Sequence, residues 1–149
     1  MSGTHSIRNI FIQGPIVAQF IAEKIIDHAA KKNIGGHSIF LGQVRADLIG
    51  DRSVTGIEYT TYEEMALEKM HEIRQAIFDK YDLTCMHVYH SLGLVAAGEI
   101  SLFVFTSSVH RAAAIEACSE TVERIKKELP VWGKELLSDQ SHVWKENRN

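Results

Sequence analysis

The sequence predicts an α+β fold with a mixed or antiparallel sheet, and three observations support this prediction. Segments with strand and helix patterns follow one another as β-α-β-β-α-β-β-β-α, with short connections. Neither GxGxxG nor GxxxxGK[ST] occurs, so the usual dinucleotide and Walker phosphate loops are absent. A chain of 149 residues, 45% of them apolar, is large enough for one core, and we expect a single domain over residues 1–149.

The first part of the chain has a strand-helix-strand pattern. Residues 6–13 are rich in β-branched and aromatic side chains and predict a strand. Residues 15–30 predict a helix in which Pro15 takes the first helical position. The apolar stripe of this helix comprises Val17, Phe20, Ile21, Ile25 and Ile26. Residues 37–45 predict a second strand, and the polar residues 46–53 predict a loop that could serve as a mobile flap.

The middle of the chain repeats the strand-helix pattern. Residues 54–62 alternate as a strand does, and residues 63–81 predict a helix. The apolar positions of this helix are Met65 or Ala66, Met70, Ile73 and Ile77. Three extended segments are then expected over residues 84–93, 94–99 and 100–107, separated by Gly93 and Gly98.

A long helix is predicted near the C-terminus, from Val109 to Leu129. Ser107 or Ser108 is the expected N-cap, and Pro130 ends the helix because proline cannot continue it. The remaining tail is expected to be irregular or to form a short strand.

The composition argues against several classes of function. The formal net charge is -3, so the chain lacks the overall positive field of a nonspecific nucleic-acid-binding protein. Cys85 and Cys118 form no CxxC, which argues against a disulfide framework and a structural zinc site. The histidines have no metal-ligand spacing, since His87 and His90 would face opposite sides of a strand. We therefore expect no metal.

Two further absences bear on location and on chemistry. The sequence opens without a cationic segment and a long apolar run, and no stretch approaches the length of a membrane span. We expect a cytoplasmic location and no membrane segment. A hydrolase nucleophile has little support, because no GxSxG occurs and Cys118 lies within a helix.

His110 and Arg111 begin the last predicted helix, where free N–H groups and the helix dipole favour an anion. Arg111 could clamp a phosphate or carboxylate there, or simply pair with a glutamate. It falls within the apolar stripe of this helix, and Lys126 lies on the flank of the same stripe. That stripe comprises Ala114, Ile115, Cys118, Val122, Ile125 and Leu129.

Arg111 and Lys126 are too far apart to line one small pocket of a single chain. Fifteen residues of helix separate them, which is roughly 22 Å. Either they are two unrelated solvated cations, or a pocket combines them from two subunits of a symmetric dimer.

Two other cations are weaker candidates. Arg45 ends the segment "FLGQVR" just before the polar loop and could bind an anion, although a strand-end arginine is usually only solvated. Lys134 lies close to Trp132 in "LPVWGKE", and its default interpretation is a surface lysine.

Five segments together resemble a known family, the large, catalytic subunit of molybdopterin synthase. They are "FLGQVR", "IEYTTYEEMA", "VAAGEISLFVFTSSVHRAAAIEAC", "IKKELPVWGKE" and "WKENR", in this order, within a resemblance that runs from Ile7 to Arg148. The resemblance implies an α/β-hammerhead fold with three main helices and an additional small β subdomain. It also implies a homodimer that docks a small ubiquitin-like sulfur-carrier subunit at each end, making a heterotetramer.

The implied activity is that of a sulfurtransferase in molybdenum cofactor biosynthesis. The C-terminal thiocarboxylate of the carrier donates sulfur, twice, to cyclic pyranopterin monophosphate and forms the dithiolene of molybdopterin. Lys126 is the implied catalytic residue, as a charge stabiliser, an acid/base or a transient acyl acceptor. The implied substrate-binding residues are Phe40, Arg45, His110, Arg111 and Arg148. No cofactor is implied, because the reactive sulfur arrives on the partner.

The sequence departs from the family pattern at Gly133, where a lysine commonly follows the tryptophan. Lys134 is the candidate replacement, although neighbours on an extended segment face opposite ways. An active sulfurtransferase and a weakened or non-catalytic carrier-binding scaffold therefore both stay open. An unrelated pterin- or nucleotide-binding regulatory domain is a third possibility if the motif match is coincidental.

Overall fold

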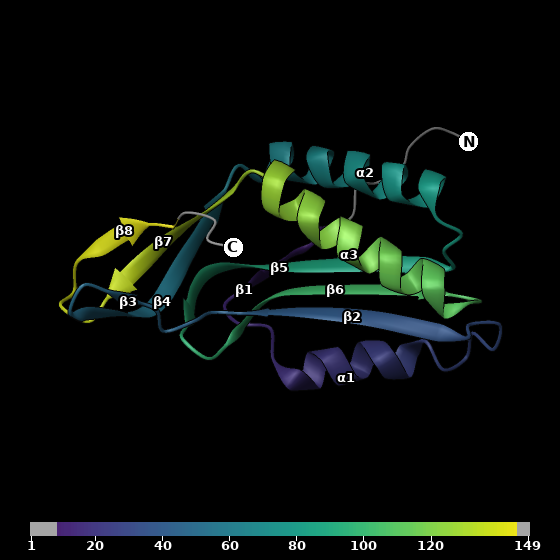
Figure 1. Ribbon diagram of the computed structural model, residues 1–149, viewed down its shortest axis with the longest axis horizontal. Coiled ribbons are helices and arrows are strands. Elements are labelled where there is room, and N and C mark those ends of the chain that lie inside the picture. The colour runs from purple at the N-terminus through teal and green to yellow at the C-terminus, as the bar shows by residue number, and fades with distance from the viewer. Residues whose placement is uncertain (1–8, 146–149) are drawn as a thin grey trace.

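The computed structural model describes residues 9–145 (Figure 1). Its 8-stranded sheet has the order β2-β6-β5-β4-β7-β8, with β1 beside β5 and β3 beside β4. The pairings are antiparallel except that of β1 with β5. The elements are β1 Phe11–Gln13, α1 Ala18–Asp27, β2 Gly36–Gln43, β3 Leu48–Ile49, β4 Arg52–Thr61, α2 Glu63–Lys80, β5 Cys85–Ala96, β6 Ile100–Ser108, α3 Arg111–Glu128, β7 Val131–Leu137 and β8 His142–Trp144.

Two parts share this sheet. Helices α2 and α3 cover one face of the larger part and α1 lies on the other, while β3, β4, β7 and β8 form a smaller part at one end (Figure 1). Strand β5 joins the two parts, because residues 85–90 pair with β6 and residues 93–96 pair with β4. This arrangement confirms the predicted α+β class with three helices and a small β subdomain. The single domain over residues 1–149 stays a prediction.

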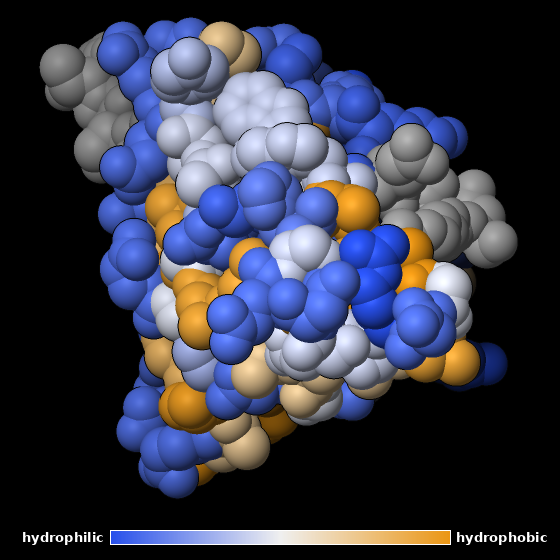
Figure 2. All heavy atoms as spheres, turned by 90° about the vertical axis from the view of Figure 1, so that its left-hand side faces the viewer, coloured by the Kyte–Doolittle hydropathy of each residue, from blue (hydrophilic) through white to orange (hydrophobic). Residues whose placement is uncertain are grey.

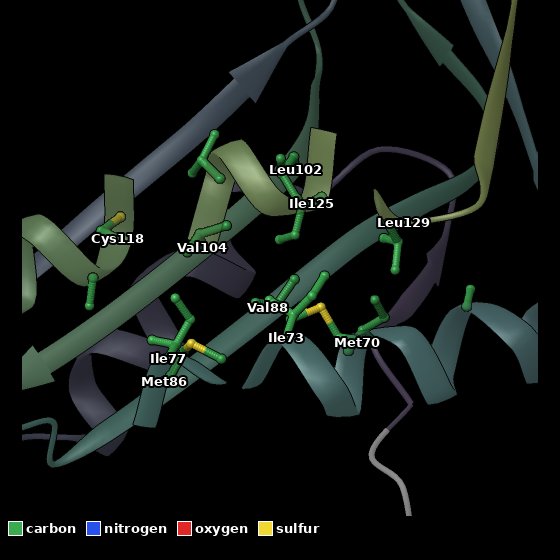
Figure 3. Close-up of a cluster of buried hydrophobic side chains, with 14 residues drawn as sticks. Met70, Ile73, Ile77, Met86, Val88, Leu102, Val104, Cys118, Ile125 and Leu129 are labelled. Atoms are coloured by element: carbon green, nitrogen blue, oxygen red, sulfur yellow. The ribbon is translucent and has the colours of Figure 1, made fainter. Parts of the chain in front are cut away.

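The main core lies between the helix pair and the sheet. Helix α2 contributes Met70, Ile73 and Ile77, which point toward the sheet strands and α3 (Figure 3). Ile73 and Ile77 have no exposed surface, and burying one such side chain contributes about 1.5–3 kcal/mol. Of the alternatives Met65 and Ala66, Ala66 is the buried one. Strands β5 and β6 and helix α3 supply the facing side chains Met86, Val88, Leu102, Val104, Cys118, Ile125 and Leu129.

Helix α1 is attached to the other face more loosely than its apolar stripe predicted. Phe20 and Ile21 pack on the buried Phe103 and Phe105, but none of the helix residues is itself buried. The prediction was wrong for Val17, Ile25 and Ile26, which are exposed by 56%, 42% and 68%. Only one edge of the stripe reaches the sheet.

The start of α1 also differs from the prediction. The helix begins at Ala18 and not at Pro15. The N–H groups of Gly14 and Ile16 donate to the carbonyls of Leu92 and Ile100, so this segment stays tied to the sheet before the helix can start.

Two other expectations need correction, those for residues 46–53 and for residues 84–99. Residues 46–53 are not a free loop, because Leu48 and Ile49 form a hairpin with the start of β4. The segments 84–93 and 94–99 are not separate, because β5 continues through Gly93, whose φ of 81° suits a residue without a side chain. The tail, expected to be irregular or to form a short strand, contains strands β7 and β8, in agreement with the second alternative.

The boundary between β6 and α3 is one or two residues later than expected. Ser107 and Ser108 belong to β6, and His110 takes the N-cap position without a side-chain capping bond. The Ser108 hydroxyl donates instead to the carbonyl of His110. Strand pairing with β2 therefore holds both serines in the sheet.

Candidate functional site

Two adjoining pockets lie where the end of β2, the middle of β4, the C-terminal turns of α3 and the segment after β8 meet. Their volumes are about 440 Å³ and about 230 Å³. Tyr59, Lys126 and Lys145 line both pockets. Sharing these side chains makes the two pockets parts of one site.

The larger pocket gathers positive charge on a protein of net negative charge. Arg45, Lys126, Lys127 and Lys145 line it together with the ring of Phe40. The carboxyl groups in the lining are Asp47, Glu123 and Glu135. Asp47 forms an ion pair of 3.3 Å with Arg45 and thereby orients the guanidinium. Such a cavity suits an anionic ligand of small-molecule size.

Lys126 is the amine most affected by this environment. Its side chain emerges from the last turn of α3, where a cation is compatible with the helix dipole. Although part of Lys126 is exposed, burial of its ammonium group lowers its pKa, and the charges of Lys145 and Arg45 lower it further. The amine therefore loses its proton more readily than an ordinary lysine, as a catalytic amine requires.

His90 and Tyr59 form the floor of the smaller pocket. The pKa of His90 is lowered to about 4, mainly by burial and to a lesser extent by the charge of Lys126, so the ring is neutral near pH 7. Its Nδ1 donates to the Ser91 carbonyl at 2.8 Å, which leaves Nε2 as an acceptor. The Tyr59 hydroxyl donates to Ser101 Oγ at 3.1 Å, and burial raises its pKa.

Three of the predicted site residues meet in this site. Phe40 points from β2 toward α3, Arg45 follows the end of β2, and Lys126 reaches the same pocket from α3. Arg148 lies outside the described residues. His110 and Arg111 lie at the opposite end of α3, where both are exposed.

The expected burial of the α3 stripe was wrong at its first turn. Arg111 has the angular position of the stripe but is exposed, and Ile115 is 54% exposed. The strand residue beside Arg111 is Gly36, which has no side chain to cover it: a Cβ at Gly36 would lie only 3.2 Å from the Arg111 Cα.

Lys134 points away from the two pockets. It stands directly across from Glu58 in the β4–β7 pairing and forms an ion pair of 3.2 Å with it. Gly133, its neighbour, lines the smaller pocket. The alternation of an extended strand thus separates the two positions, as the sequence indicated.

Lys145 also lines the site, although no sequence pattern predicted it as a site residue. Its N–H donates to the Gly133 carbonyl at 2.8 Å, which fixes the segment after β8 beside β7. A Cβ at Gly133 would lie 3.6 Å from Lys145 Cβ, 3.4 Å from Tyr59 Cε1 and 2.9 Å from Ile57 Cγ2. A side chain at position 133 would therefore enter the space beside Lys145. The available signal was the lysine in "WKENR".

Tyr59 and His90 were also missed. Strand alternation in "IEYTTY" was the clearest signal for Tyr59, since it places Tyr59 with Ile57 on one face of β4. The prediction that His87 and His90 face opposite sides is confirmed: His87 contacts His28 near α1, and His90 lines the pocket.

The face at the end of the small sheet is mainly hydrophilic, with hydrophobic side chains in separate spots (Figure 2). Within residues 9–145, no helix has the length and apolar character needed to cross a bilayer.

The MoaE protein family model matches residues 16–128 of the chain. This match covers most of the sequence and both ends of α3. The chain belongs to the MoaE family. The matched range includes Phe40, Arg45, His110, Arg111 and Lys126, whereas β7, β8 and Lys145 lie beyond it.

Relatives of this MoaE-family chain include molybdopterin synthase catalytic subunits from distant organisms. The Pyrococcus abyssi protein is 35% identical over 84% of the chain and 83% of its own length. The human protein is 35% identical over 89% of the chain and 72% of its own length. The Oryza sativa protein is 38% identical, and the chain spans 64% of its length.

Solved structures agree with the fold of this MoaE-family chain. The molybdopterin synthase structure from Staphylococcus aureus has a TM-score of 0.81 and 26% identity, covering 96% of this chain and all of that one. The Helicobacter pylori complex of subunits 1 and 2 of molybdopterin-converting factor has a TM-score of 0.77 at 23% identity. It covers 93% of this chain and 90% of the matched chain, and at this identity it supports the fold alone.

Proposed function

We propose that the chain is the catalytic subunit of molybdopterin synthase and acts as a sulfurtransferase. It takes sulfur from the C-terminal thiocarboxylate of a small ubiquitin-like carrier and transfers it to cyclic pyranopterin monophosphate. Beyond family membership, one observation carries the proposal: a pocket of about 440 Å³ brings Arg45, Lys126 and Lys145 together around the ring of Phe40. These cations match a phosphate, and the ring offers a surface for the pterin.

The chain's own residues have distinct tasks in this reaction. Arg45 binds the phosphate, and Phe40 packs against the pterin. In each transfer a C–S bond forms on the substrate while a C–O bond at the same carbon breaks, and the released oxygen leaves as water or stays on the phosphate. The carrier's acyl group, having lost its sulfur, takes an oxygen from water and ends as an ordinary carboxylate. Lys126 acts on the groups that change charge, as a charge stabiliser, an acid/base or a transient acyl acceptor. Its lowered pKa suits action as a base or as an acyl acceptor, because both need the neutral amine.

We further propose that Lys145, and not Lys134, supplies the second amine of the site. Lys145 lines both pockets and lowers the pKa of Lys126, whereas Lys134 pairs with Glu58 on the other face. A lysine at position 133 would direct its side chain toward the place that Lys145 occupies. Gly133 is therefore compatible with an active enzyme.

The proposal includes a homodimer, because His110 and Arg111 cannot reach Lys126 of their own chain. Strand β2 has 8 residues and is an edge strand, which in the described part of the chain pairs with β6 alone. An antiparallel pairing of two β2 strands about a twofold axis would place the start of one beside the end of the other. Arg111 lies beside the start, and Arg45 follows the end.

The lengths agree with this pairing. Strand β2 spans roughly 23 Å, close to the roughly 22 Å of α3 that separates Arg111 from Lys126. A twofold axis beside Phe40 would bring the partner's first turn of α3 to the mouth of the larger pocket. The exposed side chains of Ile39 and Leu41 would be covered at the same time.

The decisive experiment measures molybdopterin formed from thiocarboxylated carrier and cyclic pyranopterin monophosphate. We expect Lys126→Ala to lower turnover by about 100-fold or more and Lys145→Ala by at least about tenfold. Lys134→Ala is the matched control and should stay within about twofold, since it breaks only a partly exposed ion pair. Near-normal turnover of Lys126→Ala would remove that residue from the chemistry. Loss of activity in Lys134→Ala, with Lys145→Ala unaffected, would reverse our assignment.

The same assay tests the scaffold alternative that Gly133 suggests. A wild-type chain that binds the thiocarboxylated carrier and yields no molybdopterin would support a non-catalytic role.

A further inference from the structure

Three potential metal ligands meet on the face of the sheet that carries α1, away from the pockets beside α3. They are His28, Cys85 and His87, and their ligand atoms all lie within 4.8 Å of one another. His28 and Cys85 are buried, and His87 is partly buried. This cluster plays no part in the proposed sulfur transfer.

The register of the sheet places two of these side chains. Cys85 and His87 are two residues apart on β5, so they point to the same side. Their neighbours Met86 and Val88 point to the opposite side, into the main core. Cys85 stands across from Ser107, which in turn stands across from His37 of β2.

The third side chain comes from the end of α1. His28 is the C-cap of this helix, and its ring packs at 4.7 Å from the ring of Phe105. Its Nδ1 donates to the Lys24 carbonyl at 2.7 Å. Because a carbonyl can only accept, this bond leaves Nε2 with a lone pair aimed toward His87.

We propose that His28 Nε2, Cys85 Sγ and His87 Nε2 bind a transition-metal ion of the Zn²⁺ type. The two Nε2 atoms are 3.2 Å apart. Two imidazole nitrogens bound at about 2.0–2.1 Å in tetrahedral geometry are about 3.3 Å apart, so this distance fits. Two imidazoles and a thiolate suit Zn²⁺ and exclude the oxygen-preferring Mg²⁺ and Ca²⁺.

The fourth position is open to water or to His37. The ring of His37 lies 6.0 Å from that of His28, and its Nδ1 shares a hydrogen bond of 2.7 Å with Ser107 Oγ. His37 is exposed, so the cluster borders solvent on that side. Binding the ion requires the Cys85 thiol to release its proton to solvent.

The ion would fasten the C-terminal end of α1 to β5. Since no residue within α1 is buried, the helix gains little from packing at that end. A bond from His28 through the metal to β5 would supply the missing attachment, and metal binding would then raise the stability of the folded chain.

Titration of the tag-free, metal-stripped chain with Co²⁺ tests the proposal. We expect one Co²⁺ per chain and a thiolate-to-cobalt charge-transfer band, which Zn²⁺ displaces. Cys85→Ser should abolish the band, and His87→Gln should lower the affinity for Co²⁺ at least about tenfold. Cys118→Ser is the matched control, because Cys118 is also buried but lies on the other face of the sheet, and it should keep the band.

A second measurement separates metal binding from folding defects. Thermal unfolding of the stripped wild type and of Cys118→Ser should shift upward with added Zn²⁺. His87→Gln, altered at a partly exposed position, should fold without metal and show a smaller shift at the same Zn²⁺ concentration. No band in the wild type, or a band that survives Cys85→Ser, would overturn the proposal and leave a hydrogen-bonded histidine pair. Equal increases of the unfolding temperature with Zn²⁺ in the wild type and in His87→Gln would also overturn the proposal.

Discussion

At the scale of single residues, burial decides which groups of the site can carry charge. His90 lies under the pocket as a neutral ring, and the partly exposed Lys126 keeps an amine whose pKa is lowered. A neutral imidazole avoids the further repulsion that a protonated ring would exert on the ammonium group of Lys126. The site thus concentrates its positive charge in Arg45, Lys126, Lys127 and Lys145.

The depressed pKa of His90 predicts a loss of stability in mild acid. In the folded chain this pKa is about 4, against 6.5 in the unfolded chain, so the unfolded chain binds more protons between these values. Stability is therefore fully present above pH 6.5 and is lost as the pH falls toward 4. Between about pH 7 and about pH 5 we expect His90 to account for a loss of about 2 kcal/mol.

Chemical denaturation of the wild type and of His90→Gln at both pH values measures this effect. The free energy of unfolding of His90→Gln should change less with pH, whatever its absolute stability. His142→Gln, altered at an exposed histidine, serves as the control and should keep the wild-type dependence. Equal pH dependence in all three chains would contradict a neutral, buried His90.

At the scale of elements, the close contact between β4 and β7 explains why position 133 holds glycine. A Cβ there would lie 2.9 Å from Cγ2 of the buried Ile57, a branched group that cannot turn away. We expect Gly133→Ala to lower the free energy of unfolding by about 1–3 kcal/mol through overpacking. Gly133→Lys should make the same close contact with Ile57. A loss of activity in that variant would therefore not distinguish a destabilised fold from a catalytic defect.

A double-mutant cycle isolates this contact. In an Ile57→Ala background the opposing methyl group is gone, so Gly133→Ala should cost less than about 0.5 kcal/mol or even stabilise the chain. Chemical denaturation of the four chains gives the coupling energy. An equal cost in both backgrounds would show that Ile57 is not the obstacle.

Elements whose apolar residues repeat with one clear period were predictable from the sequence. The limits of an element were not predictable where hydrogen bonds to distant parts of the chain set them. Helix α2 was found nearly to the residue, because Met70, Ile73 and Ile77 repeat at helical spacing. The start of α1 was not, because bonds from Gly14 and Ile16 to the sheet delay it. Likewise Phe40, Arg45 and Lys126 were candidates from sequence, but the approach of Lys145 depends on the β7–β8 pairing, which no local pattern indicates.

At the scale of the whole molecule, helix α3 and edge strand β2 run side by side and carry cations at both ends. Because their lengths are similar, one twofold axis can bring Arg111 of each chain close to Lys126 of the other at both ends of the paired strands. A dimer of this kind has two equal sites, each with Arg45, Lys126 and Lys145 from one chain and His110 and Arg111 from the other. Catalysis would then depend on assembly.

Subunit complementation tests this dependence directly. Arg111→Ala and Lys126→Ala should each lose most activity as separate homodimers. In a hybrid dimer both defects fall in one site and the other site is intact. An equal mixture that exchanges subunits at random contains half hybrids, so it should recover about a quarter of wild-type activity.

Native mass spectrometry confirms that hybrid dimers form. A mixture of Lys126→Ala with Lys145→Ala is the control. Both substitutions alter the half of the site that comes from one chain, so this mixture should recover no activity. If hybrids form and the first mixture stays inactive, His110 and Arg111 do not complete the partner's pocket, and the twofold pairing of β2 is wrong.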